Sequence, residues 1–178
     1  MRALLVVLAL TGVAHGESER SLSLGLGWAT FSAPGEPVNN MEPVAIGPDY
    51  GGALAIGHER MIGTDLGLRL ELAGGVFYGG GTPEQSKTTT VLLADVGVVF
   101  RFDVLKYVPY AFGGVGALTT FGGPIDEGTS AALTVGGGLD MLVSRSRSYG
   151  FEGKLASFGG DVTVFTLGVR GTVRWGYF

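Results

Sequence analysis

The sequence predicts an all-β protein, an eight-stranded antiparallel up-and-down transmembrane β-barrel, and three observations carry this prediction. Long stretches of the chain alternate large apolar residues with small or polar ones, which is the period of a β-strand. Glycine accounts for 33 of the 178 residues and charged residues for 16%, whereas average usage is about 7% and about 25%. Beyond its first residues the chain has no run of about 20 apolar residues, so a membrane crossing would need a closed barrel with every backbone group paired.

The alternation defines eight strands in chain order, at residues 21–31, 50–59, 66–78, 88–102, 108–120, 130–143, 149–158 and 162–178. In the first three, leucine dominates one face and glycine, alanine, serine or charged residues the other; in the fourth, valine and phenylalanine form the large face. In the fifth, Tyr110, Phe112 and Leu118 share a face, and central glycines predict a bend. The last three alternate leucine, valine and aromatic residues with glycine, threonine and charges. We expect each large face to contact lipid and each small face to line the lumen.

Residues 1–16 have the pattern of a secretory signal peptide, which leaves residues 17–178 as one barrel domain. Arg2 supplies the positive charge, residues 3–10 form the apolar core, and Ala14-His15-Gly16 places small residues where a signal peptidase cleaves. The apolar segment is too short to span about 30 Å of hydrocarbon as a helix, so cleavage is favoured over an uncleaved anchor.

The last predicted strand, VTVFTLGVRGTVRWGYF, carries a resemblance to a known family. Its two arginines share a face with small or polar residues, while the opposite face is apolar and ends in aromatic residues. It resembles the closing strand of bacterial outer-membrane β-barrels, whose chains typically end in an aromatic residue. The resemblance implies that Trp175, Tyr177 and Phe178 form a signal for the barrel assembly machinery.

Across the whole mature chain the pattern resembles small outer-membrane barrels of the OmpA transmembrane-domain, OmpX and opacity-protein kind. The resemblance implies residence in the outer membrane of a Gram-negative bacterium after signal-peptide cleavage, with outer-membrane lipid as surroundings. It also implies a role in envelope integrity, adhesion or surface interaction. The partner of the external loops is not identified by the sequence.

The connections alternate in character, and this predicts an orientation. Those at 32–48, 79–87 and 121–129 are long or rich in glycine and proline, and those after even-numbered strands are short. We expect the first group to face the outside and the second the periplasm. Outward aromatic residues then fall at two levels, as interfacial anchoring requires. Those near the outer rim are Trp28, Tyr50, Tyr78 and Phe165, and those near the inner rim are Phe100, Phe102, Tyr110, Tyr149, Phe151, Trp175 and Tyr177.

Ten charged residues fall on the predicted inward faces, five acidic and five basic: Glu59, Arg69, Glu71, Asp95, Arg101, Asp140, Glu152, Lys154, Arg170 and Arg174. An eight-stranded barrel is only just wide enough for its own side chains, and buried charges are tolerated when they are paired. The set therefore predicts a charge network that plugs the lumen. A narrow channel for ions or small solutes, lined by the same residues, is the alternative.

Other classes of function receive little support from the residues. His58 is the only histidine outside the signal peptide, and without a nearby serine it suggests neither a triad nor an imidazole metal site. The glycine clusters lack the order and context of a phosphate-binding loop, so we expect no cofactor. The net charge of −4 offers no basic stripe for nucleic acid.

A secreted lipocalin-like barrel for a small ligand is a second alternative, because it would also alternate. It would, however, place its large apolar residues inside and its charges outside. The sequence therefore favours a non-enzymatic integral outer-membrane protein with a structural or surface-interaction role.

Overall fold

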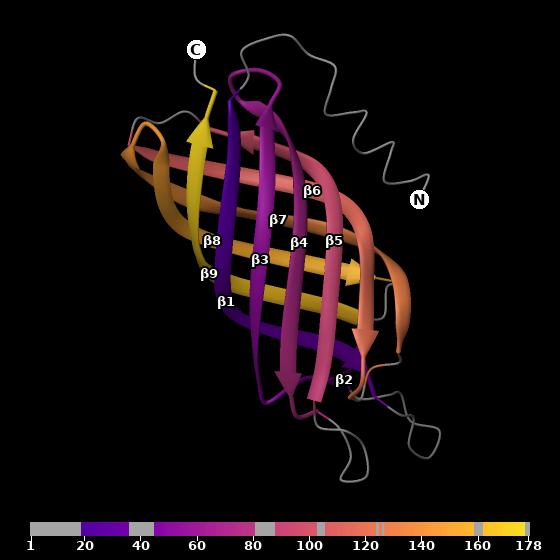
Figure 1. Cartoon of the computed structure of the whole chain (residues 1–178). Helices are drawn as coiled ribbons and strands as arrows, with labels where there is room; N and C mark the ends of the chain where they lie inside the picture. The colour runs from indigo at the N-terminus through magenta and orange to yellow at the C-terminus, as the bar shows by residue number, and fades with distance from the viewer. Residues whose placement is uncertain are drawn as a thin grey trace.

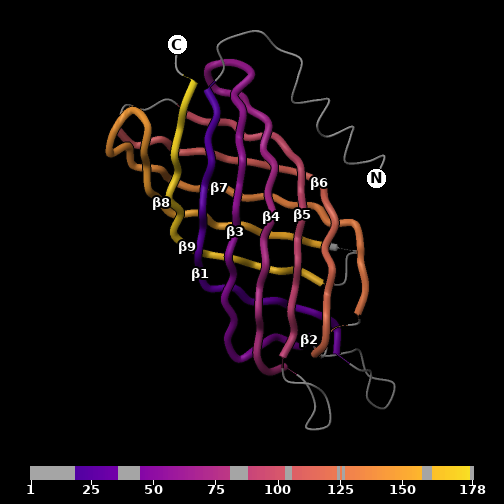
Figure 2. Tube along the Cα trace, viewed as in Figure 1, coloured from indigo at the N-terminus to yellow at the C-terminus, as the bar shows by residue number. Residues whose placement is uncertain are grey.

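The computed structural model describes residues 19–35, 45–80, 88–102, 106–123, 125, 127–158 and 162–176. Within them, eight long strands form one antiparallel sheet, each pairing with the next along the chain, and the last pairs back to the first (Figures 1 and 2). They are β1 (Arg20–Pro34), β3 (Tyr50–Met61), β4 (Leu66–Tyr78), β5 (Thr88–Arg101), β6 (Tyr107–Phe121), β7 (Gly128–Ser144), β8 (Arg147–Phe158) and β9 (Val162–Trp175). The predicted all-β, eight-stranded up-and-down barrel is confirmed.

The main difference from the predicted strand boundaries lies in the first connection. β1 continues to Pro34 and pairs there with a short additional strand, β2 (Ala45–Ile46). The prediction of a loop over the whole of 32–48 is therefore wrong at both of its ends. Pro34 is compatible with the strand because it occupies the last position, where its missing amide hydrogen is least costly. The predicted signal peptide, residues 1–16, lies outside the described residues, as do Tyr177 and Phe178.

The strands are staggered as barrel closure requires. Stepping from Ser21 on β1 through the directly paired residues of each successive strand, the circuit returns to β1 at Phe31, ten residues further along. Such a stagger accompanies strands that tilt strongly against the barrel axis. Residues that face the same level of the lumen are therefore not the ones paired across neighbouring strands.

The two ends of the barrel differ. Residues 62–65 and 145–146 connect strands at the end where β1 begins and β9 ends, and we call this the turn end (top of Figure 1). The opposite end carries β2, and we call it the loop end (bottom of Figure 1). There β4 is followed by Gly79 and Gly80, whose φ angles of 96° and 84° glycine adopts without steric cost.

The outer face of every barrel strand is apolar. Large hydrophobic side chains at mid-strand positions are well exposed, for example Leu26 at 64% and Leu133 at 65%. A continuous apolar belt of this kind would be unfavourable in water and is favourable in hydrocarbon. Since the charges lie inside the barrel, the arrangement is the reverse of the lipocalin-like alternative. No helix in the described residues is long and apolar enough to cross a membrane.

β6 has the opposite facing to the one predicted. Tyr110, Phe112 and Leu118 are 4%, 7% and 1% exposed and point into the barrel, so the assignment of Tyr110 to the interfacial aromatic residues is wrong. The outward face of β6 instead carries Tyr107 and Phe121. The inward rings fit because their cross-strand partners on β7 are glycines, Gly138 opposite Tyr110 and Gly136 opposite Phe112. A Cβ atom at Gly136 would lie 2.4 Å from the Phe112 ring, so only glycine leaves room for it.

Candidate functional site: the filled interior of the barrel

The interior is divided into two halves along the barrel axis. We call the half toward the turn end the charged half, and it holds a continuous network of ion pairs. Its members are Glu19, Glu59, Arg69, Glu71, Arg101, Asp140, Glu152, Lys154, Arg170 and Arg174. We call the half toward the loop end the apolar half, and it is lined by hydrophobic side chains.

Glu59, which is 1% exposed, lies at the centre of the charged half. Its carboxylate oxygens accept hydrogen bonds from three guanidinium groups: Arg101 at 2.5 Å, Arg170 at 3.2 Å and Arg69 at 3.5 Å. The three arginines come from β5, β9 and β4, so this one carboxylate connects strands on different sides of the barrel. Such a buried carboxylate is stable because three charge-assisted hydrogen bonds offset its desolvation.

Glu152 forms a second junction, between Arg69 and Arg170. Arg69 donates to both of its oxygens at 2.8 and 2.9 Å, and Arg170 donates to one at 3.0 Å. The Tyr110 hydroxyl donates to the same carboxylate at 2.9 Å. The rings of β6 also lie under the guanidinium groups, with Arg69 3.9 Å from the Phe112 centroid and Arg170 4.3 Å from that of Tyr110. These cation–π contacts add attraction at a site shielded from water.

The turn-end rim of the network is held by Asp140 and Glu19. Asp140 accepts from Arg170 at 3.2 Å and from Arg174 at 3.0 Å, and also from the Ser148 hydroxyl at 3.2 Å. Glu19 accepts from Arg101 at 2.5 Å and lies 3.6 Å from the Nε atom of Arg174. The Glu19 side chain is 25% exposed, which makes it the most accessible acid of the network.

On the side facing the apolar half, Glu71 pairs with Lys154 and Arg69. Asp95, the paired residue of Glu71 on β5, is different. It is 8% exposed, and its Oδ2 atom is buried without a hydrogen-bond partner among the residues described. The ten predicted lumen charges are thus all inside the barrel, but Asp95 takes no part in an ion pair there, and Glu19 completes a balance of five acids and five bases.

The apolar half closes the lumen on the loop-end side of this network. Its buried residues are Ala29, Phe31, Ala33, Phe77, Val91, Leu93, Leu118, Ile125, Ala132, Ala156, Val162 and Val164. Phe31 and Phe77 meet edge to face with their centroids 5.4 Å apart and are 3% and 1% exposed. The sequence-based prediction of a lumen plugged by charges alone is therefore incomplete, because a hydrophobic cluster fills the lumen toward the loop end.

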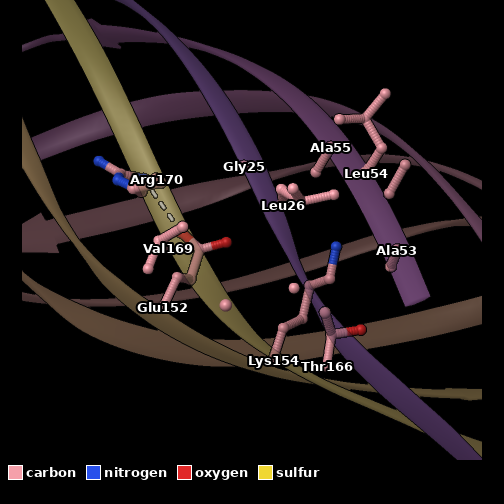
Figure 3. A pocket seen from close by; sticks show the side chains of 13 residues that line it. Gly25, Leu26, Ala53, Leu54, Ala55, Glu152, Lys154, Thr166, Val169 and Arg170 are labelled. Atoms are coloured by element: carbon pink, nitrogen blue, oxygen red, sulfur yellow. Dashed lines mark hydrogen bonds and ion pairs between the residues drawn. The ribbon is translucent and has the colours of Figure 1, made fainter. Parts of the chain in front are cut away.

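Two small cavities, about 40 and about 30 Å³, lie where the halves meet. Both are lined by Ala53, Ala73, Lys154 and Thr166. In Figure 3, Lys154 and Glu152 of β8 and Arg170 and Thr166 of β9 surround the larger cavity, opposite the alanines of β3. Each is large enough for a water molecule but too small for a solute.

Sequence reasoning missed Glu19, Tyr110 and Phe112 as members of the interior. Glu19 continues the inward alternation of Ser21 and Ser23 by one step, and this phase was the signal available for it. For β6 the available signal was the shared phase of Tyr107 and Phe121 at its two ends, where interfacial aromatic residues are expected.

The other predicted interfacial aromatic residues that the structure describes lie on the outer face at two levels, and Tyr177 lies outside the described part of the chain. Tyr50 stacks on Tyr78 and Trp28 meets Phe165 edge to face toward the loop end. Toward the turn end the outward aromatic residues are Phe100, Phe102, Tyr149, Phe151 and Trp175. His58, the one histidine in the described part of the chain, stacks on Trp175 with centroids 6.2 Å apart. Among the described residues, no group of three or more potential ligands is placed to hold a metal ion.

The fold and the apolar outer belt define the class of protein: an eight-stranded transmembrane β-barrel. No protein-family model matches the chain, and no curated protein matches its sequence. Solved structures do match it. Neisserial surface protein A is 14% identical with a TM-score of 0.64, over 90% of this chain and 98% of that one.

Three further structures show the same fold. Ail, the attachment invasion locus protein of Yersinia pestis, is 17% identical with a TM-score of 0.59, over 90% of this chain and all of the other, in a complex with the heparin analogue sucrose octasulfate. The outer membrane protein OprG of Pseudomonas aeruginosa is 12% identical with a TM-score of 0.60, over 88% and 96%. The outer membrane enzyme PagL also matches, at 13% identity and a TM-score of 0.52 over 87% and 98%. The chain therefore has the fold of the small eight-stranded outer-membrane β-barrels.

Proposed function

We propose that this protein is a non-enzymatic integral protein of the outer membrane of a Gram-negative bacterium, with a structural, non-conducting lumen and a surface role at the loop end. The observation that carries the proposal is the filling of the lumen by two unlike plugs in series, an ion network and a hydrophobic cluster. The neighbours in fold include outer-membrane proteins, which supports the location.

PagL shows that this fold is compatible with catalysis, so the absence of an enzymatic role rests on the residues of this chain. His58 lies on the outer face against Trp175, at the turn end. The carboxylates of the charged half are held in ion pairs, and the two cavities where the halves meet are too small for a substrate. Two hydroxyl groups contact these carboxylates, Ser148 on Asp140 and Tyr110 on Glu152, but both acids are already bound by arginines. Neither carboxylate is therefore free to act as the base that activates a nucleophile in covalent catalysis.

The narrow-channel alternative would require a path through both halves. Ions would have to displace guanidinium groups from Glu59 and then cross the Phe31, Phe77 and Leu118 side chains, which are buried and apolar. An ion in such surroundings loses its hydration without gaining polar partners. A closed lumen is therefore the state that this interior favours.

The first test is fractionation followed by gel mobility. The protein should be recovered with outer membranes and should migrate differently in SDS before and after boiling, since a closed barrel resists SDS until it is heated. Recovery in a soluble fraction would contradict the membrane location. The unmodified protein should then show no ion current in planar bilayers.

Variants separate the structural role of the network from a conducting one. Arg69→Leu or Glu71→Leu should lower the stability of the barrel in detergent without opening a conductance, because the apolar half remains intact. A stable current from the unmodified protein would overturn the closed lumen. A current that arises only in these two variants would mean that the ion network, and not the apolar half, is the barrier.

A further inference from the structure

The charges outside the interior network are unequally distributed between the two ends of the barrel. Among the described residues, the basic ones are Arg20, Arg60, Lys106, Arg145 and Arg147, and all lie at the turn end. Apart from Asp95 in the lumen, the remaining described acids are Asp65 at the turn end and Asp49 and Glu127 at the loop end. In the sequence, the segments that join strands at the loop end contain seven acidic residues and one lysine. The turn end is therefore the basic end of the molecule.

Two of these arginines flank Trp175 on the outer face. Arg20 is directly opposite Trp175 in the pairing of β1 with β9. Arg147 of β8 is opposite Val173, one position along the same face of β9. Both arginine side chains are exposed, Trp175 is 42% exposed, and His58 stacks on its ring. We call Arg20, His58, Arg147 and Trp175 the Trp175 cluster.

Among the described acids, the one next to this cluster along the chain does not share its surface. Glu19 precedes Arg20 but turns inward to Arg101 and Arg174. Asp65 belongs to the turn after β3. On β8, β9, β1 and β3, the outward residues at this level are basic, aromatic or aliphatic, among them Tyr149, Val173 and Leu22. The cluster thus presents positive charge at the edge of the apolar belt.

We propose that the Trp175 cluster binds the phosphate headgroup of an anionic phospholipid in the leaflet at the turn end. Guanidinium groups match phosphate with paired, charge-assisted hydrogen bonds, and tryptophan prefers the headgroup level of a bilayer. The depth is suitable because Arg20 continues the outward face of Leu22 and Leu24, and Arg147 that of Tyr149 and Phe151. This inference requires the barrel to be in lipid, but not the proposed cellular location or the closed lumen.

The protein contains two tryptophans, which allows the two ends to be compared directly. Trp28 lies toward the loop end, and Trp175 belongs to the cluster. In the Trp28→Phe variant the fluorescence reports on Trp175 alone, and in Trp175→Phe it reports on Trp28 alone. Each variant is reconstituted into phosphatidylcholine vesicles that contain brominated phosphatidylglycerol or, separately, brominated phosphatidylcholine. Quenching then gives the relative affinity of each tryptophan's surroundings for the anionic lipid.

We expect Trp175 to prefer phosphatidylglycerol about fivefold or more, since a basic residue at a membrane surface contributes about 1 kcal/mol, and Trp28 to show no preference. In the Trp28→Phe background, Arg147→Gln should reduce the preference for phosphatidylglycerol. The combination of Arg20→Gln with Arg147→Gln should abolish it. Lys106→Gln is the matched control, because it removes the same charge from the turn end but beside β6, three strands away from β9. Gel mobility before and after boiling establishes that each variant is folded.

Three results would overturn the proposal. One is equal quenching of Trp175 by the two lipids. Another is a preference that survives the loss of both arginines, or that falls equally in Lys106→Gln, because it would then reflect the general charge of the turn end. The third is competition by millimolar inorganic phosphate, which would show a site for a free anion and not for a lipid headgroup.

Discussion

The two halves of the lumen are filled by opposite chemistry, one by ion pairs and the other by hydrophobic side chains. In the charged half, Glu59 and Glu152 each bind several arginines, and the removal of one partner leaves the others buried with an unbalanced charge. In the apolar half, Phe31 and Phe77 contribute through burial, and a smaller side chain leaves a cavity and no unpaired group.

The difference shows how each half should respond to substitution. The stability of the charged half should depend on the charge of its side chains, and that of the apolar half on their volume. A buried ion network is stable when it is complete and costly when it is partly satisfied. A hydrophobic cluster tolerates changes that conserve volume. The network also pairs residues far apart in sequence, such as Arg69 with Glu152, so it fixes the relative positions of strands across the lumen. Equilibrium unfolding in urea, with the barrel in lipid vesicles, separates these properties.

The largest loss is expected for Glu59→Gln. The change preserves shape but leaves Arg69, Arg101 and Arg170 without their shared carboxylate, and breaking a buried ion pair in this way costs about 3–5 kcal/mol. Glu127→Gln is the matched control, because the hydrogen bond between its carboxylate and the Gly122 amide is exposed, and it should change the unfolding free energy little. Similar losses in the two variants would mean that the network contributes no special stability.

Phe77→Ala tests the apolar half. The ring is 1% exposed and packs against Phe31, so its removal should cost about 3 kcal/mol through lost burial and the cavity left behind. Phe77→Leu, which retains much of the volume, should cost about 1 kcal/mol. If Phe77→Leu were as destabilising as Phe77→Ala, the stability of the apolar half would not depend mainly on side-chain volume.

A smaller loss is expected for Tyr110→Phe. The ring remains under Arg170, but Glu152 loses the hydroxyl donor at 2.9 Å, and a hydrogen bond to a charged group contributes about 1.5–3 kcal/mol. Glu152 retains Arg69 and Arg170, so the loss should lie at the lower end of this range. Tyr149→Phe, on the outer face, should have almost no effect. An equal effect of both changes would place the Tyr110 hydroxyl outside the network.

The sequence was sufficient for the strands because their faces differ in size. Where leucine alternates with glycine, as in β1, the period of two identifies both the strand and its lipid face. In β6 the two faces are mixed, with Tyr107 and Phe121 on one and Tyr110 and Phe112 on the other, so size did not decide the facing. The deciding feature was room beside Gly136 and Gly138, on a different strand.

The division of the lumen could not be predicted for a related reason. Alternation shows which side chains point inward, but not which of them share a level, because that depends on a stagger of ten residues around the barrel. Glu59 and Arg170 come to lie in contact only after this stagger is known. Single large residues on small inward faces, such as Phe31 and Phe77, therefore gave no sign in the sequence that they pack against each other.

Asp95 provides the sharpest comparison, because the expected effect has the opposite sign to that of Glu59. Its Oδ2 atom is buried without a partner among the described residues, so the charged form gains no ion pair to offset its desolvation. Asp95→Asn makes the same acid-to-amide change as Glu59→Gln, yet it should raise the unfolding free energy by about 1 kcal/mol. A marked loss of stability in Asp95→Asn would show that this carboxylate is required in its charged form, and that the network extends through it toward the apolar half.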